Sequence, residues 1–235
     1  MFIQNSYRFF SDISVFDDPA IGSFTVKTDN TGTSNDNQFT VPLNQNTSDY
    51  TITTEDGQVI ENLTDSYTIT FPTSGTYKIA ITGNAFRGFF FANSSDRLKL
   101  LSVERFGTDD VFFSGSVNAG NAFARCSNIS TIPADASRWL NLCAQAANCF
   151  RDIGALSFDD ADSITMADCG NFFRFLLNCT VPTDQYSKLL INIEANNTNT
   201  SETFNGGSSK YNSSASTARA DLVTRGWTII DGGLE

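Results

Sequence analysis

The chain has 235 residues, of which 40% are hydrophobic, and its 15 Lys and Arg against 26 Asp and Glu give a formal net charge of -11. This hydrophobic share excludes wholesale disorder, and the lack of clustered cations excludes a nucleic-acid partner, because phosphate-backbone binding draws on such cations. The sequence has no histidine, the side chain best suited to proton transfer near neutral pH and the commonest metal ligand, so we expect a non-enzymatic protein without catalytic residues, cofactor or metal.

Cysteine content and the start of the chain bear on where the protein works. The five cysteines are an odd number, so they cannot all pair within one chain, and we interpret them as buried free thiols of a protein that folds in a reducing cytosol: Cys126, Cys143, Cys149, Cys169 and Cys179. The first twenty residues lack a cationic segment followed by an apolar one, and no run of about 18 apolar residues occurs. We therefore expect no signal peptide and no membrane insertion. An Asn/Ser/Thr-rich surface without an export signal is typical of a virion protein released when the host lyses.

Residues 1–22 are aromatic-rich and irregular. They either pack along the following domain or form a docking arm that inserts into a larger assembly. The candidate docking residues are Phe2, Ile3, Tyr7, Phe9 and Phe10.

Residues 23–83 alternate apolar and polar residues in six short segments, with β-branched and aromatic enrichment. This pattern is typical of strands, and turn-forming residues such as Glu55-Asp56-Gly57 separate them. Six strands spaced about ten residues apart predict an all-β, Ig-like sandwich. Residues 84–99 follow, with the run Phe89-Phe90-Phe91, and predict a seam between two domains; an aromatic ligand platform is the alternative.

Residues 100–235 combine helical spacing with short strand-like segments. Apolar residues at helical spacing predict helices over 139–150, 164–176, 183–193 and 215–223, the last one ending near Gly226. Strand-like segments near residues 103, 129, 156, 180, 204 and 229 recur about every 25 residues.

Three aligned copies of one pattern lie within this region. Phe123, Phe150 and Phe173 each precede an apolar residue, which is followed in turn by Ser130, Ser157 or Thr180. A strand plus a helix in each repeat of about 20 to 29 residues indicates a leucine-rich-repeat-like α/β solenoid with parallel strands and a C-terminal cap.

The repeat at residues 123–133, FARCSNISTIP, resembles the unit F-x-x-C-x-x-L-x-x-I-P of the BspA-type leucine-rich-repeat surface-protein family. In the second and third copies Ile153 and Leu176 replace the cysteine. The preceding module, with Glu55-Asp56-Gly57, resembles an Ig-like domain of the polycystic-kidney-disease type, although only part of that family's W-G-D-G turn is present. Residues 211–233 are similar to the ending of phage-encoded members. The resemblance spans residues 23–235 and implies adhesion and surface display.

Acidic clusters offer two further candidate sites. Asp159, Asp160 and Asp162, or Asp109 with Asp110, could supply the oxygen ligands that calcium prefers, but EF-hand spacing is absent, which favours solvated acidic turns over calcium sites. Paired carboxylates can also hydrolyse glycans.

These observations favour a bacteriophage virion protein exposed on tail or capsid, acting in host-surface recognition, adhesion or particle decoration. Its expected partners are virion proteins bound through the arm, a host glycan or protein, and further copies of itself on the particle. The alternatives are a bacterial adhesin of the BspA type and a glycan-degrading tail enzyme.

Overall fold

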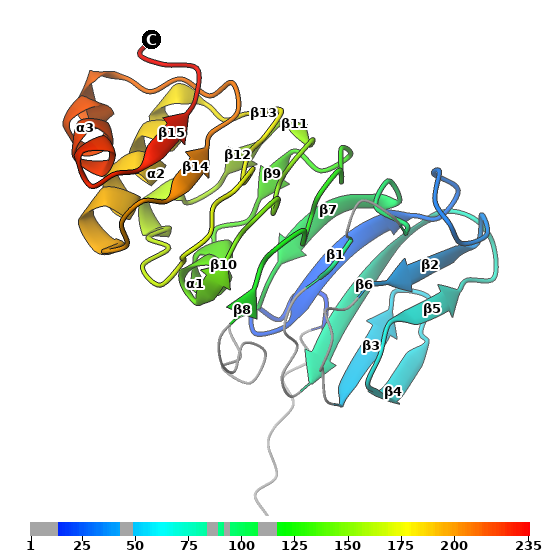
Figure 1. Ribbon diagram of the computed structural model, residues 1–235. Coiled ribbons are helices and arrows are strands. Elements are labelled where there is room, and N and C mark those ends of the chain that lie inside the picture. The colour runs from blue at the N-terminus through cyan, green and yellow to red at the C-terminus, as the bar shows by residue number, and fades with distance from the viewer. Residues whose placement is uncertain (1–13, 43–48, 84–88, 92–94, 108–116) are drawn as a thin grey trace, which may run out of the picture.

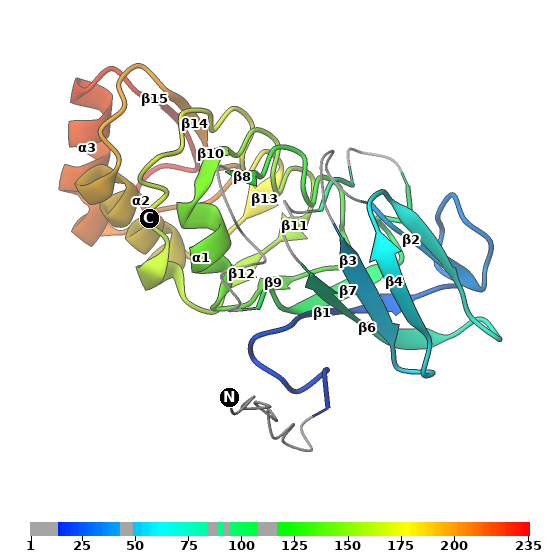
Figure 2. The ribbon, with the colours of Figure 1, turned by 90° about the horizontal axis from the view of Figure 1, so that it is seen from below.

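The computed structural model describes residues 14–42, 49–83, 89–91, 95–107 and 117–235. Strands β1 to β7 form one end of the molecule, and helices α2 and α3 lie at the other end (Figures 1 and 2). The predicted docking residues Phe2, Ile3, Tyr7, Phe9 and Phe10 lie outside the described residues.

The largest sheet has five antiparallel strands in the order β4-β3-β6-β1-β7. Its alternating sequences bury one face, with Phe24, Val26 and Ile52 at most 1% exposed. Its strands are β1 (Gly22–Lys27), β3 (Tyr50–Thr54), β4 (Val59–Leu63), β6 (Thr76–Gly83) and β7 (Leu100–Arg105). A separate antiparallel pair, β2 (Gln38–Val41) with β5 (Tyr67–Thr70), packs on this sheet through Phe39, whose ring centroid lies 5.8 Å from that of Phe24.

Aromatic rings connect this sheet to the rest of the chain. Phe89 packs edge-on against Phe24 (5.3 Å between ring centroids) and also contacts Phe123 (5.7 Å). Phe91 lies 6.2 Å from Phe123, whereas Phe90 is 37% exposed. The buried side chains on both sides of this contact therefore form one continuous core.

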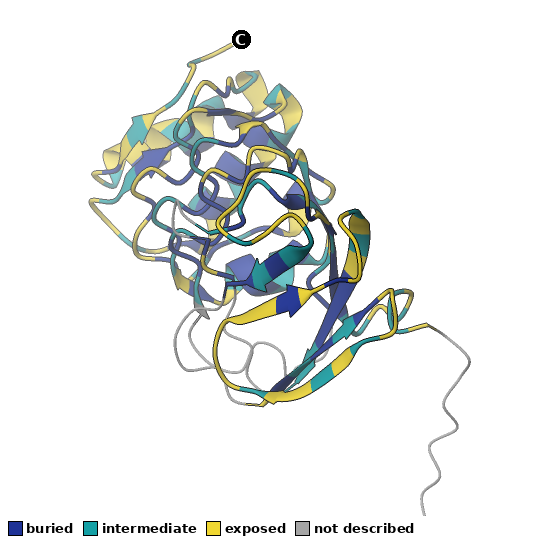
Figure 3. Cartoon of the chain, turned by 90° about the vertical axis from the view of Figure 1, so that its right-hand side faces the viewer, coloured by how far each residue is buried: buried dark blue, intermediate teal, exposed yellow. Residues whose placement is uncertain are grey.

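The C-terminal region, residues 117–235, consists of chain segments that lie side by side about 26 residues apart in sequence. The Phe123 amide donates to the Cys149 carbonyl (2.9 Å), and the Phe150 amide donates to the Phe175 carbonyl (3.0 Å). Short parallel pairs join neighbouring segments: β8 (Val117–Asn118) with β10 (Cys143–Gln145), β9 (Thr131–Ile132) with β12 (Ser157–Phe158), β11 (Gly154–Ala155) with β13 (Cys179–Thr180), and β14 (Thr203–Asn205) with β15 (Thr228–Ile230). Buried residues face the interior of this region (Figure 3).

Helices are few in the described residues. They are α1 (Ala136–Asn141), α2 (Thr183–Asn196) and α3 (Ser216–Thr224), with two 3₁₀ turns, Ala161–Ser163 and Ser213–Ala215. Helix α2 buries Tyr186, Leu189, Leu190 and Ile193, the face that their spacing predicted.

The predicted fold class, an Ig-like sandwich followed by a leucine-rich-repeat-like solenoid with parallel strands, is wrong. The only large sheet in the described residues is antiparallel, and it includes β7, which the prediction assigned to the solenoid. The parallel strands form separate two-stranded pairs of two or three residues instead of one continuous sheet. The apolar repeat was real, but its period alone does not determine how many residues of each segment pair.

The helix predicted over 164–176 is absent, and the one predicted over 139–150 is present only as far as Asn141. Helix α1 ends at Asn141, and Asn148 then has φ +58°. Within 164–176, Met166 (φ +47°) and Arg174 (φ +58°) are left-handed as well. A single left-handed residue interrupts a right-handed helix, so most buried residues of these two ranges lie outside helices.

Candidate functional site

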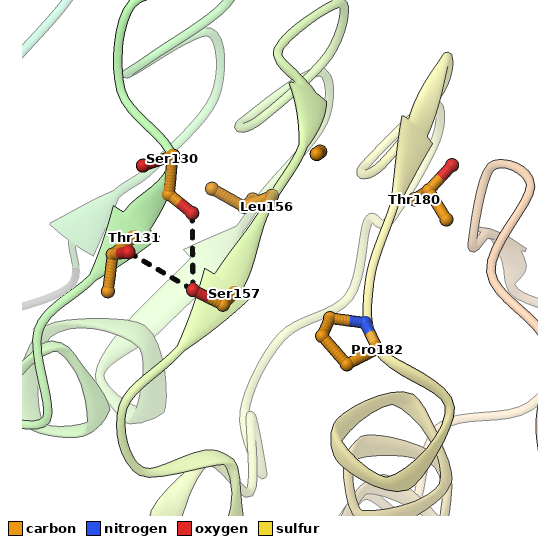
Figure 4. Close-up of a pocket in the computed structure, with 7 residues that line it drawn as sticks. Ser130, Thr131, Leu156, Ser157, Thr180 and Pro182 are labelled. Atoms are coloured by element: carbon orange, nitrogen blue, oxygen red, sulfur yellow. Dashed lines mark hydrogen bonds between the residues drawn. The ribbon is translucent and has the colours of Figure 1, made fainter.

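A surface hollow of about 410 Å³ lies across three neighbouring segments of the C-terminal region (Figure 4). We call these segments row 1 (residues 129–133), row 2 (153–159) and row 3 (178–182), and the feature the 130–182 hollow. Its volume is within the range of small-molecule sites. It is lined by Ser130, Thr131, Ala155, Leu156, Ser157, Thr180 and Pro182.

The hollow opens where row 3 stops pairing with row 2. The Leu156 amide donates to the Thr180 carbonyl (3.0 Å). In a parallel ladder, the next bond would run from the amide of residue 182 to the Leu156 carbonyl. Residue 182 is proline, which has no N–H to donate. The chain turns into helix α2 at this point, where the Pro182 carbonyl accepts a hydrogen bond from the Tyr186 amide (2.9 Å). The rows therefore separate after Thr180.

Gln185, from the first turn of α2, marks one end of this gap. Its side-chain Oε1 accepts a hydrogen bond from the Phe158 amide (2.9 Å), a donor that continued pairing with row 3 would have used. On the other side of row 2, the Ser157 amide donates to the Ser130 carbonyl (2.9 Å). Row 2 is thus held to row 1 at the same residues where it departs from row 3.

Hydroxyl groups and apolar atoms share the lining. The Thr131 and Ser157 hydroxyls lie 3.1 Å apart, and the Ser157 hydroxyl also donates to the Ser130 carbonyl (3.2 Å). Leu156 is 2% exposed, and Pro182 stands across from Ser157. None of the seven lining residues carries an ionisable side chain, so the hollow presents a neutral and predominantly apolar surface, to which polar groups make a small contribution.

The candidate calcium residues in row 2 and the turn after it make other contacts. Asp162 pairs with Lys188 (2.6 Å), which raises the pKa of that lysine, and Asp160 accepts from the Ser163 hydroxyl (2.6 Å). The described residues contain no group of three or more Cys, Asp or Glu placed to hold a metal ion. Asp109 and Asp110 lie outside the described residues.

The cysteines are free and buried, as the sequence predicted. Burial raises the pKa of the Cys126 and Cys149 thiols, which keeps them in the unreactive thiol form. They act as small apolar side chains of the core.

Sequence reasoning identified part of the 130–182 hollow without assigning it a role. Ser130, Ser157 and Thr180 follow the repeated apolar position in the three aligned copies, and the structure brings them into one lining. The hollow itself was missed, because only the pairing of the rows shows that Pro182 interrupts a ladder.

None of the helices in the described part of the chain combines the length and apolar character needed to cross a membrane. Comparison of the chain with protein-family models, with curated proteins and with solved structures gave no match.

Proposed function

We propose that this chain is a non-enzymatic recognition protein, exposed on the tail or capsid of a bacteriophage particle, that binds the host surface at the 130–182 hollow. The observation that carries the proposal is an open hollow of about 410 Å³ whose lining contains no ionisable group. General acid–base and nucleophilic catalysis both need a titratable side chain within hydrogen-bond reach of the reacting atoms. A lining of hydroxyls and apolar atoms supports binding instead.

Many copies on one particle would suit a shallow site of this kind. A small open hollow makes few contacts with its ligand, so we expect weak binding by a single copy. Simultaneous attachment of several copies raises the overall strength without any new contact. Surface display on a particle therefore fits the geometry of the site.

The test is binding of the fluorescently labelled chain to intact host bacteria and to an array of purified bacterial surface polysaccharides. Ala155 is exposed on β11 and lines the hollow, so Ala155→Trp fills the site and is expected to abolish binding. The matched control is Ala144→Trp, which places the same side chain at an exposed position of β10 outside the hollow.

Equal binding by the wild-type chain and Ala155→Trp would refute the assignment of the site. Mass spectrometry of purified phage particles tests the setting independently, and absence of the chain from them would refute the virion role. New reducing ends in polysaccharide incubated with the chain would show instead that it is an enzyme.

A further inference from the structure

The separation of rows 2 and 3 leaves the Leu156 carbonyl open as a backbone acceptor. Its amide points toward row 3, since it donates to the Thr180 carbonyl (3.0 Å). The N–H and C=O of one residue in a strand point to the same side, so the Leu156 carbonyl also faces row 3. No hydrogen bond among the described residues ends on this oxygen.

Row 3 cannot supply the missing donor. Pro182 stands at the position whose amide would reach Leu156, and it has no N–H. The neighbouring Val181 amide donates in another direction, to the Ser209 hydroxyl (2.9 Å). Leu156 as a whole residue is 2% exposed and lines the hollow, and a backbone acceptor in such a residue favours a partner that donates a hydrogen bond.

The rest of the lining limits the chemistry of that partner. With no cation among the lining residues and a formal net charge of -11 on the chain, an anionic ligand would gain no ion pair and would meet an unfavourable field. The hydroxyls of Thr131, Ser157 and Thr180 can donate or accept, while Leu156 and Pro182 offer apolar surface. A sugar ring matches this combination, because it carries hydroxyl donors at its edge and C–H groups on its faces.

We propose that the ligand of the 130–182 hollow is a neutral pyranose unit of a host-surface glycan, which donates a hydroxyl hydrogen bond to the Leu156 carbonyl. Pro182 determines this specificity, because it keeps the acceptor free and the hollow open. This inference rests on the proposed recognition function and specifies its ligand.

The experiment is a nuclear magnetic resonance titration of the full chain labelled with ¹³C at backbone carbonyls. The probes are neutral hexose and N-acetylhexosamine oligosaccharides and glucuronate oligosaccharides of the same length. We expect the neutral probes to shift the Leu156 carbonyl resonance and the glucuronate probes to leave it unchanged.

Substitution of proline tests the cause of the open acceptor. Pro182→Ala supplies an amide that can pair with Leu156, and we expect it to weaken binding of the neutral probes about tenfold, the effect of one hydrogen bond. Pro133→Ala is the matched control, since Pro133 in row 1 does not line the hollow, and it is expected to bind as the wild type does. Circular dichroism checks that both variants are folded, and the wild-type titration does not depend on either variant.

The inference is overturned by tighter binding of glucuronate than of neutral probes, by an unchanged Leu156 resonance at saturation, or by unaltered affinity in folded Pro182→Ala. If Ala155→Trp nevertheless abolishes attachment to host cells, the recognition function stands and only the identity of the ligand fails. If neither cells nor neutral probes depend on the hollow, both proposals fail.

Discussion

The Lys99 ammonium is fully buried and holds the loop between β1 and β2 in place. The Lys99 side chain is 0% exposed, and its Nζ donates to the carbonyls of Ser34 (3.1 Å), Asn35 (2.8 Å) and Gln38 (3.0 Å) and to the Ser34 hydroxyl (2.9 Å). Burial lowers the pKa of this lysine. Two carbonyls of the loop and that of Gln38, the first residue of β2, thus surround a cation that the chain itself provides.

Asp96 supplies the opposite charge through the same loop. It is 0% exposed and accepts hydrogen bonds from the amides of Ser34 (3.0 Å) and Thr40 (2.6 Å) and from the Ser34 hydroxyl (2.7 Å). The Ser34 hydroxyl therefore lies between the ammonium and the carboxylate. Each charge depends on the other to offset its loss of solvation.

Replacing Lys99 with methionine keeps much of the side-chain volume and removes the cation. The carbonyls of Ser34, Asn35 and Gln38 lose their donor, and Asp96 remains as a buried charge without the Lys99 cation. Breaking a buried charge pair in this way costs about 3–5 kcal/mol of unfolding free energy, against a total of about 5–15 kcal/mol for a typical domain. We therefore expect the melting temperature to fall by about 6–20 °C.

Urea and thermal unfolding followed by far-ultraviolet circular dichroism measure this change. Lys78→Met is the matched control, because Lys78 is exposed on β6 and its loss is expected to change stability by less than about 0.5 kcal/mol. A loss below about 1 kcal/mol in Lys99→Met, or equal losses in the two variants, would refute the reasoning.

Three further predictions concern pH, backbone geometry and the aromatic core. Burial favours a higher pKa for Asp96, but hydrogen bonds from Ser34, Thr40 and Thr33 outweigh it and lower the pKa below 3.8. The stability that the Asp96 carboxylate contributes is therefore present above pH 3.8 and lost as the pH falls through the lower pKa of the folded state. Acid titration of Asp96→Asn should show a shallower loss of stability than that of the wild type. Gly207 has φ +68°, and a Cβ there would lie 2.2 Å from the Cys179 carbonyl oxygen, whereas a Cβ at Gly57 (φ +92°) meets nothing within 4 Å. Gly207→Ala should therefore lower the free energy of unfolding in urea by more than about 3 kcal/mol, and Gly57→Ala by about 1 kcal/mol. Equal losses would contradict the steric argument. Phe123→Ala should lower the free energy of unfolding by about 3–5 kcal/mol, because Phe123 is 0% exposed. Phe173→Ala should lower it much less, because Phe173 is 49% exposed. A larger loss in Phe173→Ala, measured by calorimetry, would exclude Phe123 from the core.

The strands of the N-terminal sheet could be located from sequence because the signal is local. Alternation over β3 and β6 directly reflects one buried and one exposed face, and all six strands expected over 23–83 are present. Their pairing order was beyond reach, since β1 lies between β6 and β7, which are distant in the sequence.

The apolar recurrence in the C-terminal region correctly placed Phe123 beside Phe150, whose rings stack 5.9 Å apart. The third phenylalanine of the predicted pattern, Phe173, was wrong. Phe175 packs against Phe150 instead, with 5.4 Å between the two ring centroids. Arg174, between Phe173 and Phe175, has φ +58°, and such a left-handed residue changes which neighbouring side chains point inward. A pattern of apolar letters cannot register that change.

Left-handed residues also mark the turns more faithfully than helical spacing does. Asn121 (φ +59°) and Asn148 (φ +58°) occupy equivalent places in successive segments, as do Asp152 (φ +62°) and Asn178 (φ +59°). Asn and Asp tolerate this conformation better than other non-glycine residues. The recurrence of Asn148 at this period was therefore a sequence signal against a continuous helix over 139–150, whereas Met166 and Arg174 gave no such signal within 164–176.

The 130–182 hollow depends on where a proline stands relative to the residues whose amides pair with the neighbouring row. The sequence alone does not show this pairing, so it could not reveal the hollow. Pro133 and Pro182 both end a strand-like segment, yet they differ in effect. Row 2 pairs with row 1 at Ile132, whose carbonyl accepts a hydrogen bond from the Asp159 amide (2.9 Å). This pairing involves the residue before Pro133, so it does not require an amide on the proline. Row 2 meets row 3 at Thr180, and the next residue whose amide is required is Pro182 itself. With the proline one position earlier or later in row 3, residue 182 would carry an amide that pairs with the Leu156 carbonyl, and this oxygen would no longer be available to a ligand.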